Sequence, residues 1–430
     1  MLQENIKIVI KKNKKIWFIS KYCRLPSEKI HYEDVFQVKG SYPARGFSIL
    51  RCLAIQGYDC TLFVARHDYK LFSFSYSPSN EVRYIDGVRV VIINIIPYKK
   101  VQSLARVFGW IQFEIKLFLL NKKDLPRPDH IIASSLSLLS IINGIFFRLR
   151  FRSSLVFEIR DIWPLVLTEN GKFSNFNPFV LGLKFIEWIG YKYSDHIVAT
   201  MPNLSEHVEN VLGYKKNVSC IPLGISEELM TQTPIPLTED ILRSLPENKF
   251  IVTYVGSIGI DNALDTFFEV ARMFKDSNKV VFRIFGRGDL LQEYKSRCSD
   301  LSNVVFNGFI PNPMVQSVLE KSSILYFATH PTIVLKYGQS LNKIIDYMYA
   351  AKPIIASHSG YKSMINEARC GYFVPAGDKE TLYSEVVRLS DLSKEQLRVI
   401  GLRGKEWILK NRQYSILARN YASLLEERVF

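Results

Sequence analysis

The stretch YGQSLNKIIDYMYAAKPIIAS, residues 337–357, places a lysine and an aspartate three positions apart, Lys343 and Asp346. Gly338 and Ser340 predict a tight loop, and apolar residues at helical spacing predict a helix directly after it. The free N–H groups and the dipole at a helix start favour anions, so a lysine in the first turn predicts a site for phosphate oxygens. Asp346, one turn further on, could accept hydrogen bonds from sugar hydroxyls. The alternative is that both side chains lie on the surface of an ordinary amphipathic helix.

The strands predicted between residues 250 and 328 each end in a turn of glycine, small or polar residues. These turns follow strands at 250–255, 280–285 and 304–306, and they read Gly256-Ser257-Ile258-Gly259, Gly286-Arg287-Gly288 and Asn307-Gly308-Phe309-Ile310. A strand followed by a glycine loop and a helix, here predicted from about 263 to 274, can cradle phosphate. Because the carboxyl ends of parallel strands meet at one edge of a sheet, the turns predict one binding crevice in a doubly wound domain.

The first half of the chain predicts a second parallel sheet. Apolar runs predict strands at 16–19, 60–65, 88–96, 156–159, 196–200 and 218–221, with a helix from about 47 to 56. A strand, a helix and a strand in succession imply parallel pairing. Arg160 and Asp161 follow the strand 156–159, where adjacent opposite charges could orient a hydroxyl and a phosphate. The alternative for this pair is a solvated loop.

Length and charge bound the organisation of the protein. The 430 residues are too many for one compact core, and we expect domains at 1–228 and 229–410 with a helix over 411–430 that packs back toward the N-terminal domain. This last segment belongs to a stretch that we expect to be helical from 406 onward. Of the net charge of +15, residues 1–225 carry +13, which suggests an anionic partner such as a membrane surface, a nucleic acid or a phosphorylated substrate.

The basic half contains two apolar, aromatic segments, residues 101–120 and 136–151. Lys122 and Lys123 lie just beyond the first, and Arg148, Arg150 and Arg152 lie at the end of the second. This pattern is typical of helices at a bilayer interface, although a buried helix with a charged end would also produce it. No stretch of about 18 uncharged apolar residues predicts a spanning helix, and the N-terminus does not resemble a signal peptide. The six cysteines are scattered and show no metal-binding spacing, so we expect a reducing cytoplasm and no metal site.

The order and spacing of these landmarks resemble those of GT-B glycosyltransferases, in particular the retaining family GT4, over nearly the whole chain. The matching pieces are GSYPARGFSILRCLAIQGYDCTLFVA, EIRDIWP, IPLGI, VTYVGSIG, FGRGDL, VVFNGFI and SLNKIIDYMYAAKPIIAS. EIRDIWPLVLTENG and SLNKIIDYM are most similar to bacterial transferases that add N-acetylated amino sugars, such as N-acetylfucosamine, in O-antigen or capsule assembly. The resemblance implies an α/β fold of two doubly wound Rossmann-like domains with an interdomain cleft.

The resemblance also implies a reaction. A sugar would move from a nucleoside-diphosphate sugar, UDP-linked, to a polyprenyl-diphosphate-linked saccharide, with the anomeric configuration retained and without a metal or another cofactor. Stabilising the charge on the departing diphosphate is the main task of such catalysis. Together with the basic first half, this predicts a cytoplasmic protein held peripherally on the anionic inner face of the cell membrane.

Residue roles follow from the same resemblance. Asp346 matches the second carboxylate of the family's glutamate pair, which holds the nucleotide ribose, whereas Gly338 stands where the first glutamate would be. Ser257 and Asn262 stand roughly where many members carry an arginine and a lysine for the diphosphate, so Lys343, Arg287 and the loop amides would supply the positive field. The predicted catalytic residues are Lys343, Asp161 and Arg287. The predicted donor-binding residues are Gly256, Ser257, Ile258, Gly259, Gly286, Phe309, Ile310, Gly338, Ser340, Leu341, Asn342 and Asp346. The predicted acceptor-binding residues are Gly40, Ser41, Tyr42, Arg45 and Arg160.

Other function classes fit less well. A dinucleotide-dependent oxidoreductase would need a GxGxxG fingerprint after its first strand, which this sequence lacks. A sugar-nucleotide epimerase of the same fold does not require a basic, membrane-seeking half. A scaffold subunit that keeps the fold without catalysis would explain Gly338. Nucleic-acid binding would explain the charge, but no helix-turn-helix, zinc-finger or RNA-recognition motif is present.

Overall fold

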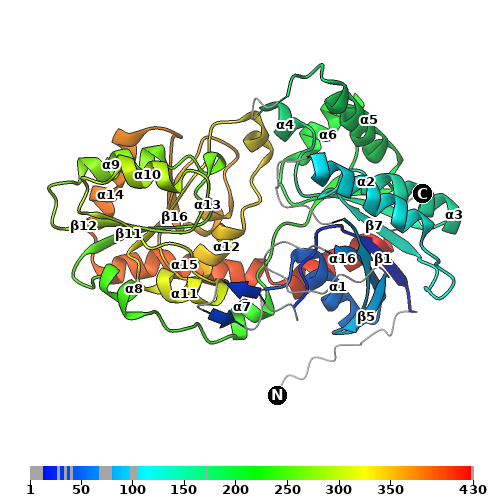
Figure 1. Ribbon diagram of the computed structural model, residues 1–430, viewed down its shortest axis with the longest axis horizontal. Coiled ribbons are helices and arrows are strands. Elements are labelled where there is room, and N and C mark those ends of the chain that lie inside the picture. Colours follow the sequence, from blue (N-terminus) through cyan, green and yellow to red (C-terminus); the bar gives the residue numbers. More distant parts are fainter. Residues whose placement is uncertain are drawn as a thin grey trace. The chain divides into compact units, whose positions relative to one another are not determined.

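The computed structural model describes residues 13–26, 30–32, 36–38, 42–66, 80–96, 104–169 and 173–427. The chain divides into two compact units, shown in Figure 1. Unit 1 comprises residues 1–200, 205–221 and 414–430, and unit 2 comprises residues 201–204 and 222–413. Each unit is built on a parallel β-sheet with helices on both faces. The predicted class, α/β with two doubly wound sheets, is therefore confirmed.

The sheet of unit 1 has the strand order β10-β9-β8-β7-β1-β4-β6-β5. Its strands are β1 (Lys15–Ile19), β4 (Asp59–Arg66), β5 (Glu81–Ile85), β6 (Val88–Asn94), β7 (His130–Ser134), β8 (Ser154–Ile159), β9 (His196–Ala199) and β10 (Val218–Cys220). Neighbouring strands are parallel except at β5, which pairs antiparallel with β6. The short strands β2 (Ile30–Tyr32) and β3 (Phe36–Val38) form a separate antiparallel pair.

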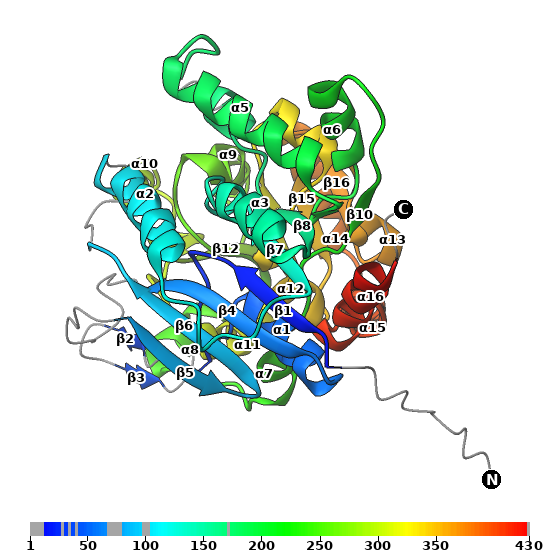
Figure 2. The ribbon, with the colours of Figure 1, turned by 90° about the vertical axis from the view of Figure 1, so that its right-hand side faces the viewer.

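Helices cover both faces of this sheet. They are α1 (Arg45–Ile55), α2 (Leu104–Leu119), α3 (Ser140–Phe151), α4 (Leu165–Glu169), α5 (Pro178–Tyr193), α6 (Leu204–Leu212) and α16 (Tyr414–Glu426). The first and last of them, α1 and α16, pack together over the apolar side chains of one face, among them Phe18 and Leu62. On the opposite face α3 packs between α2 and α5 (Figure 2), where Trp17 meets Phe63 and Phe147 edge to face.

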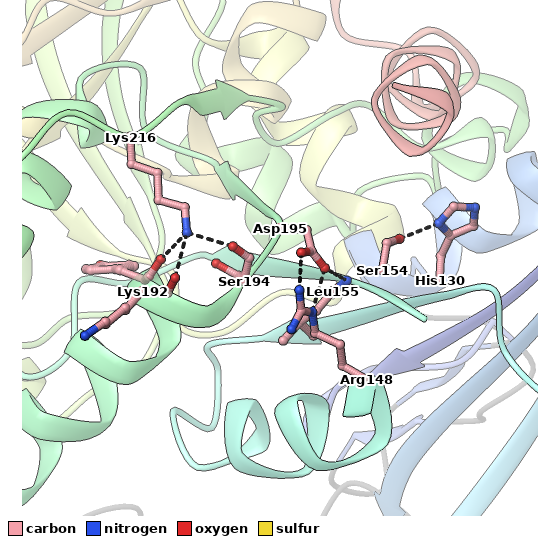
Figure 3. Close-up of polar contacts among 9 residues, drawn as sticks. His130, Arg148, Ser154, Leu155, Lys192, Ser194, Asp195 and Lys216 are labelled. Carbon is pink, nitrogen blue, oxygen red and sulfur yellow. Dashed lines mark hydrogen bonds and ion pairs between the residues drawn. The ribbon is translucent and has the colours of Figure 1, made fainter. Parts of the chain in front are cut away.

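Polar contacts tie the helix ends of unit 1 to the sheet (Figure 3). The ammonium of Lys216 donates to three carbonyls at the end of α5, including those of Lys192 at 3.1 Å and Ser194 at 2.7 Å. Arg148 of α3 donates to the carboxylate of Asp195, which also accepts from the Leu155 amide at 2.8 Å. Carbonyls at a helix end lack partners within the helix, so Lys216 supplies the missing hydrogen bonds at the end of α5. Arg148 and Asp195 instead form an ion pair that joins α3 to the start of β8.

The sheet of unit 2 has the order β13-β12-β11-β14-β15-β16, and all of its described pairs are parallel. Its strands are β11 (Phe250–Val255), β12 (Val280–Phe285), β13 (Val304–Phe306), β14 (Ile324–Ala328), β15 (Ile354–Ser357) and β16 (Gly371–Val374). The direction of strand progression reverses between β11 and β14. In sheets of this kind ligands bind beyond the carboxyl ends of the strands at such a reversal, so the loops that follow β11 and β14 occupy the expected place.

The helices of unit 2 lie on both faces of its sheet (Figure 1). They are α7 (Glu227–Thr231), α8 (Glu239–Ser244), α9 (Asp265–Met273), α10 (Leu291–Arg297), α11 (Asn312–Lys321), α12 (Asn342–Tyr349), α13 (Met364–Ala368), α14 (Lys379–Ser390) and α15 (Lys394–Asn411), with 3₁₀ turns η1 (Ile260–Asn262) and η2 (Ile333–Tyr337). Helices α9 and α14 pack together on one face, and α12 packs with α11 and α15 on the other.

The prediction of one helix from residue 406 onward is wrong at its centre. Helix α15 ends at Asn411, and α16 begins at Tyr414. Between them Gln413 forms a parallel bridge with Ile225, and the Ile225 amide donates to the Arg412 carbonyl at 2.8 Å. These backbone groups pair with a distant segment and so leave the helical hydrogen-bond pattern. Sequence periodicity could not show this pairing.

Candidate functional site

Two glycine turns of unit 2 lie directly against each other at the carboxyl ends of β11 and β12. The Ile258 amide donates to the Arg287 carbonyl at 2.9 Å. Gly286 has φ +150°, and a Cβ on it would lie 1.8 Å from the Gly256 carbonyl oxygen. Only a glycine permits this approach, because any side chain would collide with backbone. The structure thus brings the predicted donor-binding turns 256–259 and 286–288 together.

Lys343 reaches this pair of turns from the first turn of α12. Its ammonium donates to Asn262 Oδ1 at 2.6 Å and to Tyr254 Oη at 3.1 Å, and it lies 4.7 Å from the centre of the Tyr254 ring. A Cβ on Gly256 would be 3.1 Å from Nζ, so the cation lies at the loop that follows β11. Burial lowers the pKa of Lys343 to about 8, because a partly desolvated ammonium is less stable than one in water.

Tyr254 is a site residue that the sequence did not indicate. It is completely buried in β11, and its hydroxyl donates to the Ser257 carbonyl at 2.6 Å while accepting from Lys343. The side chain therefore fixes both the loop and the cation. In the sequence, a tyrosine within an apolar strand predicts only a core residue. The hydrogen bond with Lys343 of α12 shows that Tyr254 also positions this cation.

Asp346 lies one turn further along α12. Burial raises the pKa of its carboxyl to about 7. Among the residues that the structure describes, no hydrogen-bond donor or cation contacts this carboxylate. Asp346 is half-buried, so part of the carboxylate is withdrawn from water, and donors from a ligand would relieve the cost of that partial burial.

Arg287 and Phe309 lie together at the neighbouring turns. The guanidinium of Arg287 is exposed and stacks over the Phe309 ring, 4.6 Å from its centre. Phe309 is itself 40% exposed, whereas Ile310 is buried. Stacking on an aromatic ring orients a guanidinium while leaving its N–H edges available for hydrogen bonds.

The loop before α12 is held by the segment 201–204. The Asn203 amide donates to the Tyr337 carbonyl at 2.9 Å. Gly338 has φ +114°, and a Cβ there would lie 2.4 Å from Pro202 Cδ. Of the other predicted residues of this stretch, Ser340 and Leu341 are half-buried and Asn342 is exposed. A glutamate at position 338 would need both a backbone conformation that is essentially limited to glycine and space that Pro202 fills.

The predicted acceptor residues belong to unit 1. Asp161 is exposed in the turn after β8, and the adjacent Arg160 amide donates to Ser135 Oγ at 2.9 Å. These two residues lie at the carboxyl edge of the sheet, where the sequence placed them. Tyr42 is half-buried just before α1, whereas Gly40 and Ser41 lie outside the described residues.

Arg45 lies inside unit 1. Its guanidinium is buried and lies 3.1 Å from a carboxylate oxygen of Glu158, which also accepts from the hydroxyl of Tyr421. Arg45 thus links α1 to β8 and, through Glu158, to α16. A role for Arg45 in acceptor binding remains a prediction from the resemblance.

A buried polar network at the carboxyl ends of β1 and β7 also escaped the sequence analysis. Glu114 of α2 accepts from Ser140 Oγ at 2.6 Å and from Asn143 Nδ2 at 2.7 Å at the start of α3, and burial raises its pKa to about 7. Trp110 Nε1 donates at 2.7 Å to the Tyr22 hydroxyl, which also accepts from the buried Lys21. The sequence held one sign of this network, because Glu114 is an acidic residue within an otherwise apolar helical segment.

Two features concern binding more generally. In the described part of the chain, no group of three His, Cys, Asp or Glu side chains could hold a metal ion. The helices of the same residues include none with the length and apolar character that crossing a bilayer requires.

Comparison with known proteins bears on both units. Residues 249–391 match the family model described as glycosyl transferases group 1. A comparison with curated proteins found no match. Similar solved structures include a sucrose-phosphate synthase from Thermosynechococcus elongatus, at 17% identity and a TM-score of 0.68 over 96% of this chain and 98% of that one.

Two further structures have 12% identity and also cover 96% of this chain. The E. coli trehalose-6-phosphate structure bound with UDP-2-fluoro glucose has a TM-score of 0.70 and is covered over 99% of its length. Anabaena HepE in complex with UDP and glucose has a TM-score of 0.62 and is covered over 100%. Likeness at this identity shows the fold. The chain therefore has the GT-B fold, and its residues 249–391 match the family model of glycosyl transferases group 1.

Proposed function

We propose that the protein is a retaining glycosyltransferase that takes its sugar from a nucleoside-diphosphate sugar. The observation that carries the proposal is the ammonium of Lys343, held at the first turn of α12 beside the glycine loop that follows β11. A helix start, a cation and loop amides together form a site for a diphosphate. Asp346 in the next turn has the unpaired carboxylate that ribose hydroxyls would satisfy.

In the proposed reaction the bond between the anomeric carbon and the diphosphate oxygen breaks. The acceptor oxygen forms its new bond on the same face of the sugar, and its proton passes to the departing phosphate. Lys343, Arg287 and the loop amides stabilise the negative charge that develops on the diphosphate, and the protein's own cations make a metal unnecessary. Asp161 orients the acceptor hydroxyl.

Uridine is the base that we propose. The support is that the HepE structure contains UDP and that the E. coli structure contains UDP-2-fluoro glucose. The backbone of Phe309 and Ile310 would present hydrogen-bonding groups to the base. For the sugar we propose an N-acetylated amino sugar used in bacterial surface polysaccharide, O-antigen or capsule. That part of the proposal is supported by the resemblance of EIRDIWPLVLTENG and SLNKIIDYM.

Thermal unfolding with UDP, GDP, ADP and dTDP tests the donor site. At about 100 times its dissociation constant, the correct nucleotide should add roughly 2.7 kcal/mol of stability. We expect UDP to raise the melting temperature of the wild type and of the control Lys295→Ala, whose lysine is exposed on α10, but not that of Lys343→Ala. If no nucleotide stabilises the wild type, the scaffold alternative replaces this proposal.

The pH dependence of kcat/KM should be bell-shaped with its maximum between about pH 7 and pH 8. Asp346 must be ionised to accept ribose hydroxyls, so kcat/KM falls as pH drops below its pKa of about 7. Lys343 must be protonated to stabilise the diphosphate, so kcat/KM also falls as pH rises above about 8. Lys343→Arg should move the alkaline limb out of the measured range, because arginine stays charged. An alkaline limb that is unchanged in this variant would contradict the assignment.

We further propose that the acceptor is lipid-linked, a polyprenyl-diphosphate saccharide at the anionic inner face of the cell membrane. The support is an exposed apolar face on α2 and α3, consisting of Phe108, Ile111, Ile115, Phe118, Leu119, Ile142, Phe146 and Leu149. Phe118 and Phe146 join the two helices, with ring centres 4.7 Å apart. Lys122, Lys123, Arg150 and Arg152 follow the two helices or end them. Apolar side chains beside cations suit a bilayer interface.

Sedimentation with liposomes that contain anionic lipid tests this surface. We expect binding at low salt that weakens as salt rises, since the cations contribute through the surface potential. The double variant Phe108→Ser/Leu149→Ser should reduce partitioning by roughly tenfold or more, because each change removes a large apolar side chain from the interface. The control Ile55→Ser alters a residue of similar exposure at the end of α1. Equal loss in the control, or no binding by the wild type, would remove the membrane claim.

A further inference from the structure

The side-chain amide of Gln339 has no partner for either of its polar atoms. Both Oε1 and Nε2 are withdrawn from solvent, and neither makes a hydrogen bond within the described residues. Buried polar atoms are paired in native structures with few exceptions, because an unpaired one costs free energy. A group that is both a donor and an acceptor and lacks both partners is therefore a candidate ligand contact.

The backbone around Gln339 is fixed. The preceding Gly338 donates its amide to the Leu335 carbonyl at 3.2 Å and lies against Pro202, and the Asn203 amide holds the Tyr337 carbonyl. Helix α12 begins only three residues later, at Asn342. These contacts hold the backbone on both sides of Gln339, so the position of its side chain is restricted by the fold of unit 2.

Gln339 also lies at an informative place in the chain. Four residues later Lys343 contacts the loop after β11, which is the diphosphate site of the proposed function. The donor sugar is bonded directly to the diphosphate, so the loop that leads into α12 and its lysine is a candidate to contact the sugar. In this loop Gly338 has no side chain, and the next residue, Gln339, carries the unpaired amide.

We propose that the Gln339 carboxamide binds the sugar of the donor, with Nε2 donating a hydrogen bond and Oε1 accepting one. This inference rests on the proposed function and adds to it the residue that reads the sugar. The sugar substituent must supply an acceptor and a donor close together. An acetamido group does so through its C=O and N–H, and a pair of neighbouring hydroxyls does so as well.

Isothermal titration with UDP, UDP-glucose and UDP-N-acetylglucosamine tests the inference in the wild type, Gln339→Leu, Gln339→Glu and the control Gln292→Leu, whose glutamine is exposed on α10. In Gln339→Leu the affinity for the preferred UDP-sugar should fall about tenfold or more relative to that for UDP. The melting temperature without ligand should not fall, because leucine removes an unpaired amide of similar size. The control should match the wild type.

The two sugars identify the substituent. Gln339→Glu can accept hydrogen bonds but cannot donate one when it is ionised. A larger loss of UDP-N-acetylglucosamine than of UDP-glucose in this variant indicates an acetamido partner, and the reverse order indicates hydroxyls. Equal losses for UDP and both UDP-sugars in Gln339→Leu, or a lower melting temperature without ligand, would show a structural role and overturn the inference. A wild type that binds none of the three ligands would instead remove the proposed function on which it rests.

Discussion

Replacing Lys343 with alanine is expected to lower turnover by about two to three orders of magnitude, the effect of removing one preorganised donor from a developing anion. The cation lies where the helix start of α12 meets the loop after β11, so its loss leaves the departing diphosphate with the weaker field of backbone amides. The fold should persist. Burial already disfavours the charged lysine, as its pKa of about 8 shows, so its removal costs little stability.

Steady-state release of UDP from the donor that binding identifies measures this effect. Lys343→Arg keeps the charge but not the compact fit between Asn262 and Tyr254, so we expect a rate between those of the wild type and Lys343→Ala. The exposed Lys295→Ala is the control for loss of an ordinary surface lysine. An unchanged turnover in Lys343→Ala would refute the proposed mechanism.

Placing the family's glutamate with Gly338→Glu should lower the free energy of unfolding by about 2–6 kcal/mol. The backbone at φ +114° accounts for roughly 1–3 kcal/mol of this, and the overlap with Pro202 accounts for a similar amount. Urea unfolding gives the value directly. Gly182→Glu is the control, since the structure shows no atom within 4 Å of a Cβ at that position of α5.

The same variant addresses the argument for a non-catalytic scaffold. That argument took Gly338 as the loss of a functional carboxylate, but the local backbone requires glycine whatever the protein does. If Gly338→Glu were as stable as the wild type, the glycine would have no structural reason, and the scaffold alternative would regain its main support.

The sequence predicted the elements of unit 2 well because each apolar run ends in a glycine turn, and such patterns are local. The position of Lys343 in the first turn of α12 was predicted for a related reason, since the start of a helix and the charge of its first turn are both visible in one short window. Its partner Tyr254 was missed because a tyrosine in a buried strand has the same appearance whether or not its hydroxyl meets a distant helix.

In unit 1 the environment of some predicted residues depends on contacts between segments that are far apart in the sequence, which local patterns do not show. Arg45 looked available for an acceptor because Glu158 and Tyr421, its neighbours in space, are 113 and 376 positions away in the chain. For α2 the sequence allowed either a buried helix or a surface helix. The structure leaves Phe108 75% exposed but buries Phe113 completely, so one helix has both a core face and an outer face.

The position of α16 has a consequence for how the protein is made. This helix is the last described element of the chain, yet it packs on α1 and contributes Tyr421 to the buried contact with Glu158. A ribosome must therefore synthesise the chain as far as α16, which spans Tyr414–Glu426, before unit 1 can close its core. Unit 2 is almost continuous in sequence from residue 222 to 413, so all of its helices and strands are synthesised before α16. During translation unit 2 can thus complete its fold first, while the apolar side chains of α1 that α16 later covers are still exposed.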